Sequence, residues 1–238
     1  MGVHTVFDRQ MLENALDWWR EAGVDTLVGD APHDWFAAPP PRSPVPVDAP
    51  APDAAMPGEW EAFAAWRAGP HAPDAAWLGD GVLASGPIDA GVMILTDLPD
   101  REDCAQGTLL TGEPGRLFDR MLHAIGLSRD TVHLVSVCAK RPTGGRVGRS
   151  DEPRLGEVAL HHLSIARPKR VLLLGDAASR VLLGTEVPRA RGRLHPVSHR
   201  SGTSEAVASF HPRYLLEHPG RKREAWADLQ LLKRGLDR

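Results

Sequence analysis

The sequence predicts an α/β fold, a three-layer α/β/α sandwich with a central parallel sheet. From residue 90 onward, short apolar runs alternate with segments of helical periodicity. That alternation requires crossover connections, which make the strands parallel. The apolar runs are nearly continuous, as in the run over 171–174, which indicates a sheet covered by helices on both faces. A chain of 238 residues, of which 42% are hydrophobic, is long enough for one such domain with an appendage.

Composition divides the chain into three parts, namely an N-terminal helical extension over 1–37, a Pro/Ala-rich linker over 38–58 and the α/β domain over 59–238. In the extension, Leu12, Leu16 and Trp19 recur at helical spacing and predict one apolar face. The linker has few large apolar residues, so we expect that it cannot bury enough surface to order itself.

Periodicity and turn residues predict the elements of the α/β domain. In chain order they are a Trp-bearing helix over 59–69, a strand over 91–97, a helix over 113–126, a strand over 131–138, a helix over 152–166, a strand over 169–175, a helix over 176–184, a strand over 206–210 and a helix over 220–236. Leu117, Met121 and Ile125 share one face of the second helix, which predicts a core contact.

Parallel sheets of this kind bind ligands at the carboxyl ends of their strands. Those ends fall in the segments 95–100, 136–142, 172–176 and 209–215. The turn His211-Pro212 therefore points into the expected site. We interpret His211 as a functional residue at the end of its strand, although an ordinary turn histidine is the alternative.

Composition also excludes several classes of protein. No run reaches the roughly 18 apolar residues of a membrane span, and the first residues lack a signal peptide's basic and apolar regions. Cys104 and Cys138 form no C-x-x-C pair, so neither a disulfide framework nor a metal site is indicated. His161 and His162 are adjacent on a helix and face apart, which favours solvent and groove-edge positions. We expect a reduced, cytoplasmic, monomeric protein without a cofactor.

Charge is distributed unevenly along the chain. Residues 1–138 hold 8 Lys and Arg against 21 Asp and Glu, a net charge of −13, whereas residues 139–238 hold 20 against 10, a net charge of +10. This asymmetry favours one face that meets a polyanion. The alternative is that Arg-rich composition and helix C-termini account for the excess.

Short motifs in a fixed order resemble the uracil-DNA glycosylase superfamily, especially its family 4 type, over about residues 82–236. They are TDLPD at 96–100, REDCAQG at 101–107, LLTG at 109–112, RPTGGR at 141–146, RPKRVLLLG at 167–175 and HPRYLL at 211–216. The stretch ALDWWREAGVD near the N-terminus resembles an extension found in some members. GDAPHDW at 29–35 mimics the first motif, but no apolar strand leads into it, so we interpret it as a decoy.

The resemblance implies an enzyme that flips a deoxyuridine out of DNA and cleaves its N-glycosidic bond. It assigns catalysis to Asp97, which positions water or stabilises the sugar cation, and to His211, which donates to the uracil O2. The implied base pocket consists of Thr96, Leu98, Pro99, Asp100, Leu110 and Ser136, with Leu110 at the position of a stacking aromatic and Ser136 at that of a base-reading amide. The implied DNA contacts are Arg141, Arg146, Arg213, Tyr214 and Leu215, with Leu215 as the apolar wedge that fills the gap left by the base.

The sequence departs from the family pattern at several of these positions. Thr96 and Asp100 replace glycines, and Asp100 brings a negative charge to where the anionic base would form. Family members often carry a [4Fe–4S] cluster on four cysteines. The matching positions here are Gly69, Ala72, Lys140 and Leu155, which predicts no cluster and no metal. In the family, the cluster holds the loops that its cysteines bound. Here we expect packing of Trp66 and Trp77 to hold the corresponding loops instead.

Two functional hypotheses follow. The first is an active but divergent DNA glycosylase that removes uracil or another damaged base in base-excision repair, with full or attenuated activity. The second is a catalytically inactive DNA-binding protein of the same fold. A third, a small nucleotide-binding protein, is disfavoured because no Gly-rich phosphate loop is present. The role of Asp97 distinguishes the first two hypotheses. In the enzyme it is the catalytic carboxylate, and in the inactive protein it is an ordinary residue at a strand end.

Overall fold

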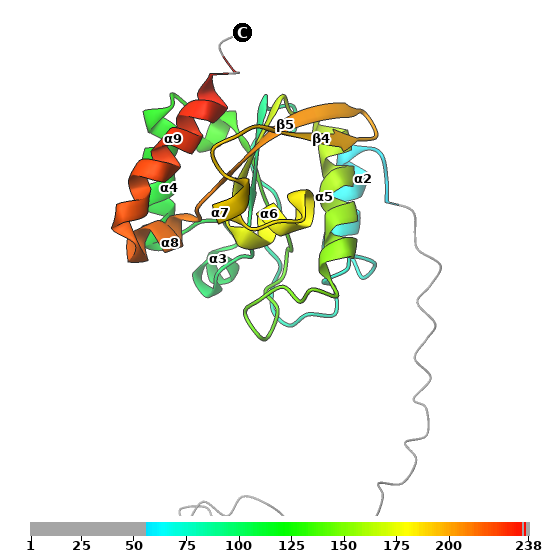
Figure 1. Ribbon diagram of the computed structural model, residues 1–238. Helices are drawn as coiled ribbons and strands as arrows, with labels where there is room; N and C mark the ends of the chain where they lie inside the picture. Colours follow the sequence, from blue (N-terminus) through cyan, green and yellow to red (C-terminus); the bar gives the residue numbers. More distant parts are fainter. Residues whose placement is uncertain (1–55, 235, 237–238) are drawn as a thin grey trace, which may run out of the picture. The chain divides into compact units, whose positions relative to one another are not determined.

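The computed structural model describes residues 56–234 and 236 (Figure 1). The predicted helical extension and most of the predicted linker lie outside the described residues. The helices are α2 (Trp60–Ala68), α3 (Arg101–Gln106), α4 (Gly112–Ala124), α5 (Glu152–Ala166), α6 (Asp176–Leu183), α7 (Val187–Ala190), α8 (Pro212–Glu217) and α9 (Lys222–Lys233). The strands are β1 (Val92–Thr96), β2 (His133–Ser136), β3 (Arg170–Leu174), β4 (His195–His199) and β5 (Gly202–Ser209).

One five-stranded sheet in the order β2-β1-β3-β5-β4 forms the centre of the described fold. Strands β2, β1, β3 and β5 are mutually parallel, which confirms the predicted α/β class. Strand β4 was not predicted, and it runs antiparallel to β5 at the edge of the sheet. Its sequence carries Pro196 and buries only Val197, so it lacks the continuous apolar run of the inner strands, as is common at a sheet edge.

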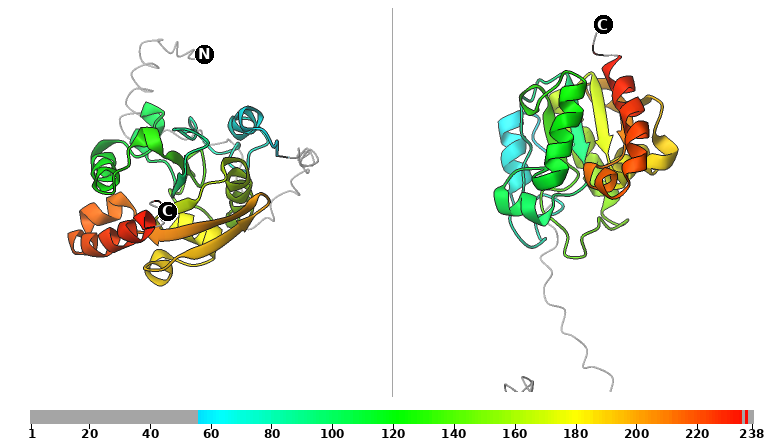
Figure 2. Two further views of the ribbon diagram at one scale, coloured as in Figure 1. Left: turned by 90° about the horizontal axis from the view of Figure 1, so that it is seen from above. Right: turned by 90° about the vertical axis from the view of Figure 1, so that its left-hand side faces the viewer.

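Helices cover both faces of the sheet. Alternate residues of a strand point to opposite faces, so Ile94 packs with the core cluster of α4 and α9, whereas Met93 and Leu95 pack with that of α5 and α6. Figures 1 and 2 show α4 and α9 on one side of the sheet and α5 on the other, with α2 beside α5. None of the helices in the ranges 56–234 and 236 is long and apolar enough to cross a membrane.

A buried histidine pair lies where α2 covers the edge strand β2. The Nε2 atoms of His133 and His162 are 2.9 Å apart, and the Nδ1 of His133 lies 3.2 Å from the carbonyl of Gly86. If that Nδ1 donates, the neutral His133 ring accepts at Nε2 and His162 donates to it. The Trp60 ring stacks on His162. His162 is 4% exposed, so the prediction of a solvent or groove-edge position was wrong for it.

This pair predicts a loss of stability in acid. Burial lowers the pKa of His133 and lowers that of His162 well below its usual value. The unfolded chain therefore binds protons that the folded chain excludes, and stability falls as pH drops below about 6.5. His162→Gln keeps an N–H donor toward His133 but cannot be protonated. We expect its free energy of unfolding to fall less steeply, by up to about 1.4 kcal/mol per pH unit.

The measurement is urea unfolding between pH 4 and pH 8, and the matched control is His161→Gln. His161 is the helical neighbour, and its Nε2 contacts the carbonyl of Pro57 rather than His133. An acid slope in His162→Gln that equals the slope of the unmodified protein would contradict the role given to this pair.

Candidate functional site

Two hollows open at the carboxyl ends of the parallel strands. The first, of about 190 Å³, is lined by Asp97, Leu98, Asp100, Arg141, Gly145, His211, Arg213, Tyr214 and Glu217. The second, of about 210 Å³, is lined by Asp97, Gly175, Asp176, Val187, Pro188, Phe210, His211 and Tyr214. Asp97, His211 and Tyr214 line both. The two predicted catalytic residues therefore meet at one place, as the strand-end argument requires.

Asp97 follows β1 directly and is held against the start of α6. Its Oδ1 accepts a hydrogen bond of 2.8 Å from the backbone N–H of Ala178. Burial, to which the nearby charge of Asp176 adds, raises the pKa of Asp97 to about 7 against the opposing effect of the hydrogen bond from Ala178. Gly175 makes this approach possible, because its φ is +107° and a Cβ there would collide with the Asp97 carboxylate.

His211 precedes the first turn of α8 as its N-cap. Its Nδ1 accepts a hydrogen bond of 3.2 Å from the backbone N–H of Arg213, so the proton of the neutral ring is on Nε2. Burial lowers the pKa of His211 to about 4, with a small opposing contribution from Asp103. At pH 7 the ring is a neutral donor. Its pKa and that of Asp97 are pushed in opposite directions, a pattern typical of acid–base sites.

Four residues of the implied base pocket lie away from both hollows. Thr96 is 1% exposed, Leu110 2% and Ser136 6%, and Pro99 is also buried. Leu98 and Asp100 do line the first hollow. The structure thus brings Asp97, Leu98 and Asp100 of the first motif to the site, but not Leu110 and Ser136, the residues implied at the family's stacking and base-reading positions.

Leu110 is fixed in the core by its own backbone. Its φ is +54°, and its carbonyl accepts a hydrogen bond of 2.6 Å from Arg129. Gly115 lies so close to that carbonyl that a Cβ would collide with it. The side chain packs in the cluster beneath α4, so it contributes no surface to the hollows.

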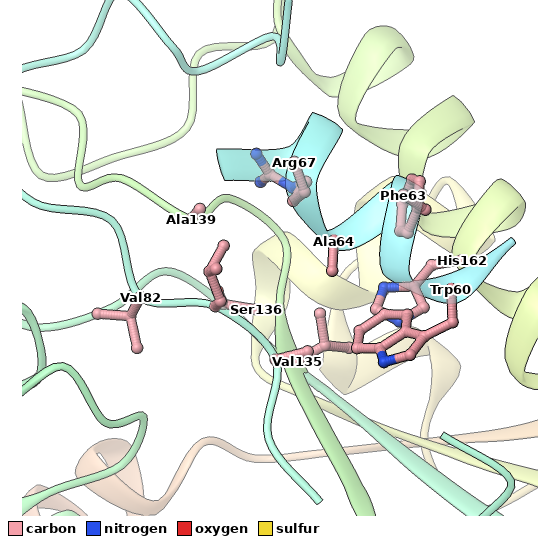
Figure 3. Close-up of a pocket in the computed structure, with 11 residues that line it drawn as sticks. Trp60, Phe63, Ala64, Arg67, Val82, Val135, Ser136, Ala139 and His162 are labelled. Atoms are coloured by element: carbon pink, nitrogen blue, oxygen red, sulfur yellow. The ribbon is translucent and has the colours of Figure 1, made fainter. Parts of the chain in front are cut away.

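Ser136 faces a different pocket. Its hydroxyl donates a hydrogen bond of 2.6 Å to the carbonyl of Cys138. It lines an apolar pocket of about 90 Å³ together with Trp60, Phe63 and Arg67 of α2 and with His162 (Figure 3). That pocket shares no lining residue with either hollow.

Leu215 is 1% exposed and packs in the core with Leu117 and Ala225. A side chain in this position cannot reach into a duplex, so the wedge prediction for Leu215 was wrong. Its neighbour Tyr214 is 36% exposed, and Arg146 is exposed on the loop after β2.

A column of three aromatic rings stands on α8 beside the site. The ring centroids of Phe210 and Tyr214 are 5.1 Å apart and those of Tyr214 and His218 are 4.1 Å apart, with both pairs stacked. This column was not predicted from the sequence, although the spacing of four residues between its members was the available signal. Asp176 was not predicted either, although it follows the end of β3 after Gly175, much as Asp97 follows β1.

The cluster positions of the family do not fit an iron–sulfur cluster here, since Gly69, Ala72, Lys140 and Leu155 offer no thiolate. Within the described residues, no group of three or more His, Cys, Asp or Glu side chains could hold a metal ion. Burial raises the pKa of the Cys138 thiol to about 12, which makes it a poor ligand.

An ion pair and its hydrogen bonds join the segment after α2 to the loop after β2. Asp74 is 1% exposed and binds both terminal nitrogens of Arg67. It also accepts hydrogen bonds from the backbone N–H groups of Ala139 and Lys140, and the Lys140 ammonium donates to the carbonyl of Ala75. Trp66 and Trp77 do pack nearby in separate clusters, but the direct links between the loops are polar.

A family model described as the Uracil DNA glycosylase superfamily matches residues 83–230, more than half of the chain. The chain belongs to this superfamily. Among characterised proteins, it is similar to the type-4 uracil-DNA glycosylase of Sulfurisphaera tokodaii. The two are 22% identical over 160 residues, which cover 64% of this chain and 73% of that relative. The chain is thus a family 4-like member of the superfamily.

Proposed function

We propose that the protein is a DNA glycosylase that acts slowly on deaminated bases in DNA, in base-excision repair. The observation that carries this proposal is the meeting of Asp97 and His211 at the two hollows, with the pKa of the first raised to about 7 and that of the second lowered to about 4. The superfamily match and the type-4 relative support DNA as the partner.

The chemistry follows from the two side chains. A nucleotide flipped out of DNA places its sugar near Asp97 and its base near His211. As the bond between C1′ and the base nitrogen breaks, its electron pair leaves with the base and the sugar gains positive charge. The ionised Asp97 stabilises that charge and accepts the proton of the water that attacks C1′. The Nε2–H of neutral His211 donates to the oxygen on which the negative charge of the base develops.

We expect a slow rate of base release because Leu110 and Ser136, two residues of the implied base pocket, do not line the hollows. Stacking on an aromatic ring is worth about 1–3 kcal/mol per base, and buried Leu110 supplies none. A lost bidentate contact to a base edge costs about 1–3 kcal/mol in discrimination, and Ser136 is turned toward Cys138. Since about 1.36 kcal/mol is a factor of ten in rate, these losses correspond to one or more decades.

The burial of Leu110 and Ser136 also favours the second hypothesis, a DNA-binding protein without activity. In that case the fold and the basic residues recruit or sense DNA, and no base is released. The two hypotheses agree on DNA binding and differ only in the cleavage step, so a direct assay separates them.

The experiment is base release from single- and double-stranded oligonucleotides that carry uracil, hypoxanthine or other damaged bases, followed by alkaline cleavage at the abasic site. We expect slow release that increases with pH through about 7, as Asp97 ionises, and that is lost in Asp97→Asn and His211→Gln. The matched control is His123→Gln, an exposed histidine of α4. DNA binding without release of any base would establish the second hypothesis instead.

A further inference from the structure

Asp100 holds two arginines in the first hollow. Its carboxylate forms an ion pair with Arg213 and lies 3.4 Å from Nη1 of Arg141. The two arginines come from different parts of the chain, Arg141 from the loop after β2 and Arg213 from the first turn of α8. All three line the hollow together with Asp97 and His211. The charge that the sequence analysis expected to repel an anionic base is therefore already neutralised.

The chemistry of this cluster is that of a phosphate site. Guanidinium groups bind carboxylate and phosphate oxygens with the same planar array of donors. Here two guanidinium groups converge on one carboxylate in a hollow open to solvent. The carboxylate thus occupies the place that a phosphate group would take between the two cations.

Exposure makes the carboxylate replaceable. The side chain of Arg213 is 46% exposed and that of Arg141 is 26% exposed, while that of Asp100 is 15% exposed. The ion pairs are thus partly open to solvent, where ion pairs contribute little to stability, so a ligand with more negative charge can compete for the two arginines. Arg141 also donates a hydrogen bond of 2.9 Å to the carbonyl of Pro99, which keeps it in place when Asp100 is displaced.

We propose that the first hollow is a phosphate subsite in which Asp100 occupies the two arginines until a backbone phosphate of the nucleic acid displaces its carboxylate. This inference rests on the proposed function for the identity of the ligand. In the free protein, Asp100 keeps Arg141 and Arg213 paired and lowers the affinity for DNA. In the complex, both guanidinium groups contact phosphate.

The test is DNA binding by Asp100→Asn as a function of salt. Asparagine removes the charge but remains a good residue at the start of α3. We expect DNA to bind about five-fold or more tightly at 0.1 M salt, the effect of releasing an exposed ion pair. The slope of log K against log salt concentration should stay within about 0.9, the value of one duplex phosphate contact, of that of the unmodified protein, because both arginines contact phosphate in either complex.

Glu217→Gln is the matched control. Glu217 lines the same hollow, and its replacement removes the same charge, but no ion pair of Glu217 occurs within the described part of the chain. Its affinity should rise less and its salt slope should not change. The double variant Asp100→Asn/Arg213→Ala should lose most of the gain. An effect of Asp100→Asn no larger than that of Glu217→Gln would overturn the inference.

Inorganic phosphate separates this inference from the proposed function. Calorimetric titration should show tighter phosphate binding by Asp100→Asn than by the unmodified protein or by Glu217→Gln. If phosphate binds in this order but no DNA binds, the subsite stands and the proposed function fails. If DNA binds but phosphate affinity ignores Asp100, the proposed function stands and the subsite does not.

Discussion

Asp74→Ala is expected to lower the free energy of unfolding by about 3–5 kcal/mol, the usual cost of removing one partner of a buried ion pair. Arg67 would remain 10% exposed without its carboxylate, and the backbone N–H groups of Ala139 and Lys140 would lose their acceptor. The pKa of Asp74 points the same way. Burial opposes ionisation, yet the bond to Arg67 and its charge leave the pKa below its ordinary value.

Chemical unfolding at pH 7 measures this loss. Asp80→Ala is the matched control, because Asp80 lies in the same segment and is exposed, so its removal should change stability by less than about 0.5 kcal/mol. Asp74→Asn should lie between the two, since the amide oxygen can still accept from the backbone. Equal stability of Asp74→Ala and the unmodified protein would mean that packing of Trp66 and Trp77 holds the loops after all.

Asp97→Asn is expected to stabilise the protein at pH 8 by up to about 4 kcal/mol, at about 1.36 kcal/mol per unit of pKa shift. The folded protein holds a proton on Asp97 up to about pH 7, whereas the ordinary value is 3.8. Stability therefore falls as pH rises from about 4 to about 7, and the full penalty is present above that range. Asparagine carries no charge and still accepts from Ala178.

The comparison of the two proteins across pH gives the check. The gain should vanish below about pH 3, where Asp97 is protonated in the folded and unfolded states. Asp130→Asn, an exposed carboxylate near β2, should show no such dependence. Base release should be lost in the stabilised variant, because the same desolvated carboxylate carries the chemistry. If Asp97→Asn were less stable than the unmodified protein at pH 8, the buried charge of Asp97 would not be the cause of the stability penalty.

Much of the fold was predictable because its signals are local. The helix α5 has the bounds that periodicity predicts, 152–166, since its apolar stripe and its Pro153 near the N-terminus both lie within the segment. Strand β4 was missed because an edge strand with one buried residue shows neither a continuous apolar run nor a clear alternation. The position of β4 depends on its pairing with β5, and the residues of β4 alone do not indicate that pairing.

The sequence predicted where the candidate site lies, at the carboxyl ends of the strands, but not which side chains face it. The order of the elements places Asp97 and His211 at one edge of the sheet, because carboxyl ends of parallel strands meet there, whereas the role of Asp97 was implied only by the family resemblance. The direction of a side chain does not follow from that order. Leu110 is turned inward by a left-handed backbone and by Arg129, a residue distant in sequence. The burial of Leu215 likewise depends on where α4 and α9 pack against α8.

Tyr214 is the only tyrosine of the chain, and it lines both hollows while the residue remains 36% exposed. Protein prepared with tyrosine labelled at one ring position would therefore give one aromatic signal in a magnetic resonance spectrum, and that signal comes from the site itself. The stacked rings of Phe210 and His218 shift its resonance through their ring currents. The seven tryptophans, which dominate the fluorescence of the protein, do not interfere with such a label. The resonance of Tyr214 would therefore report directly whether a ligand occupies the hollows.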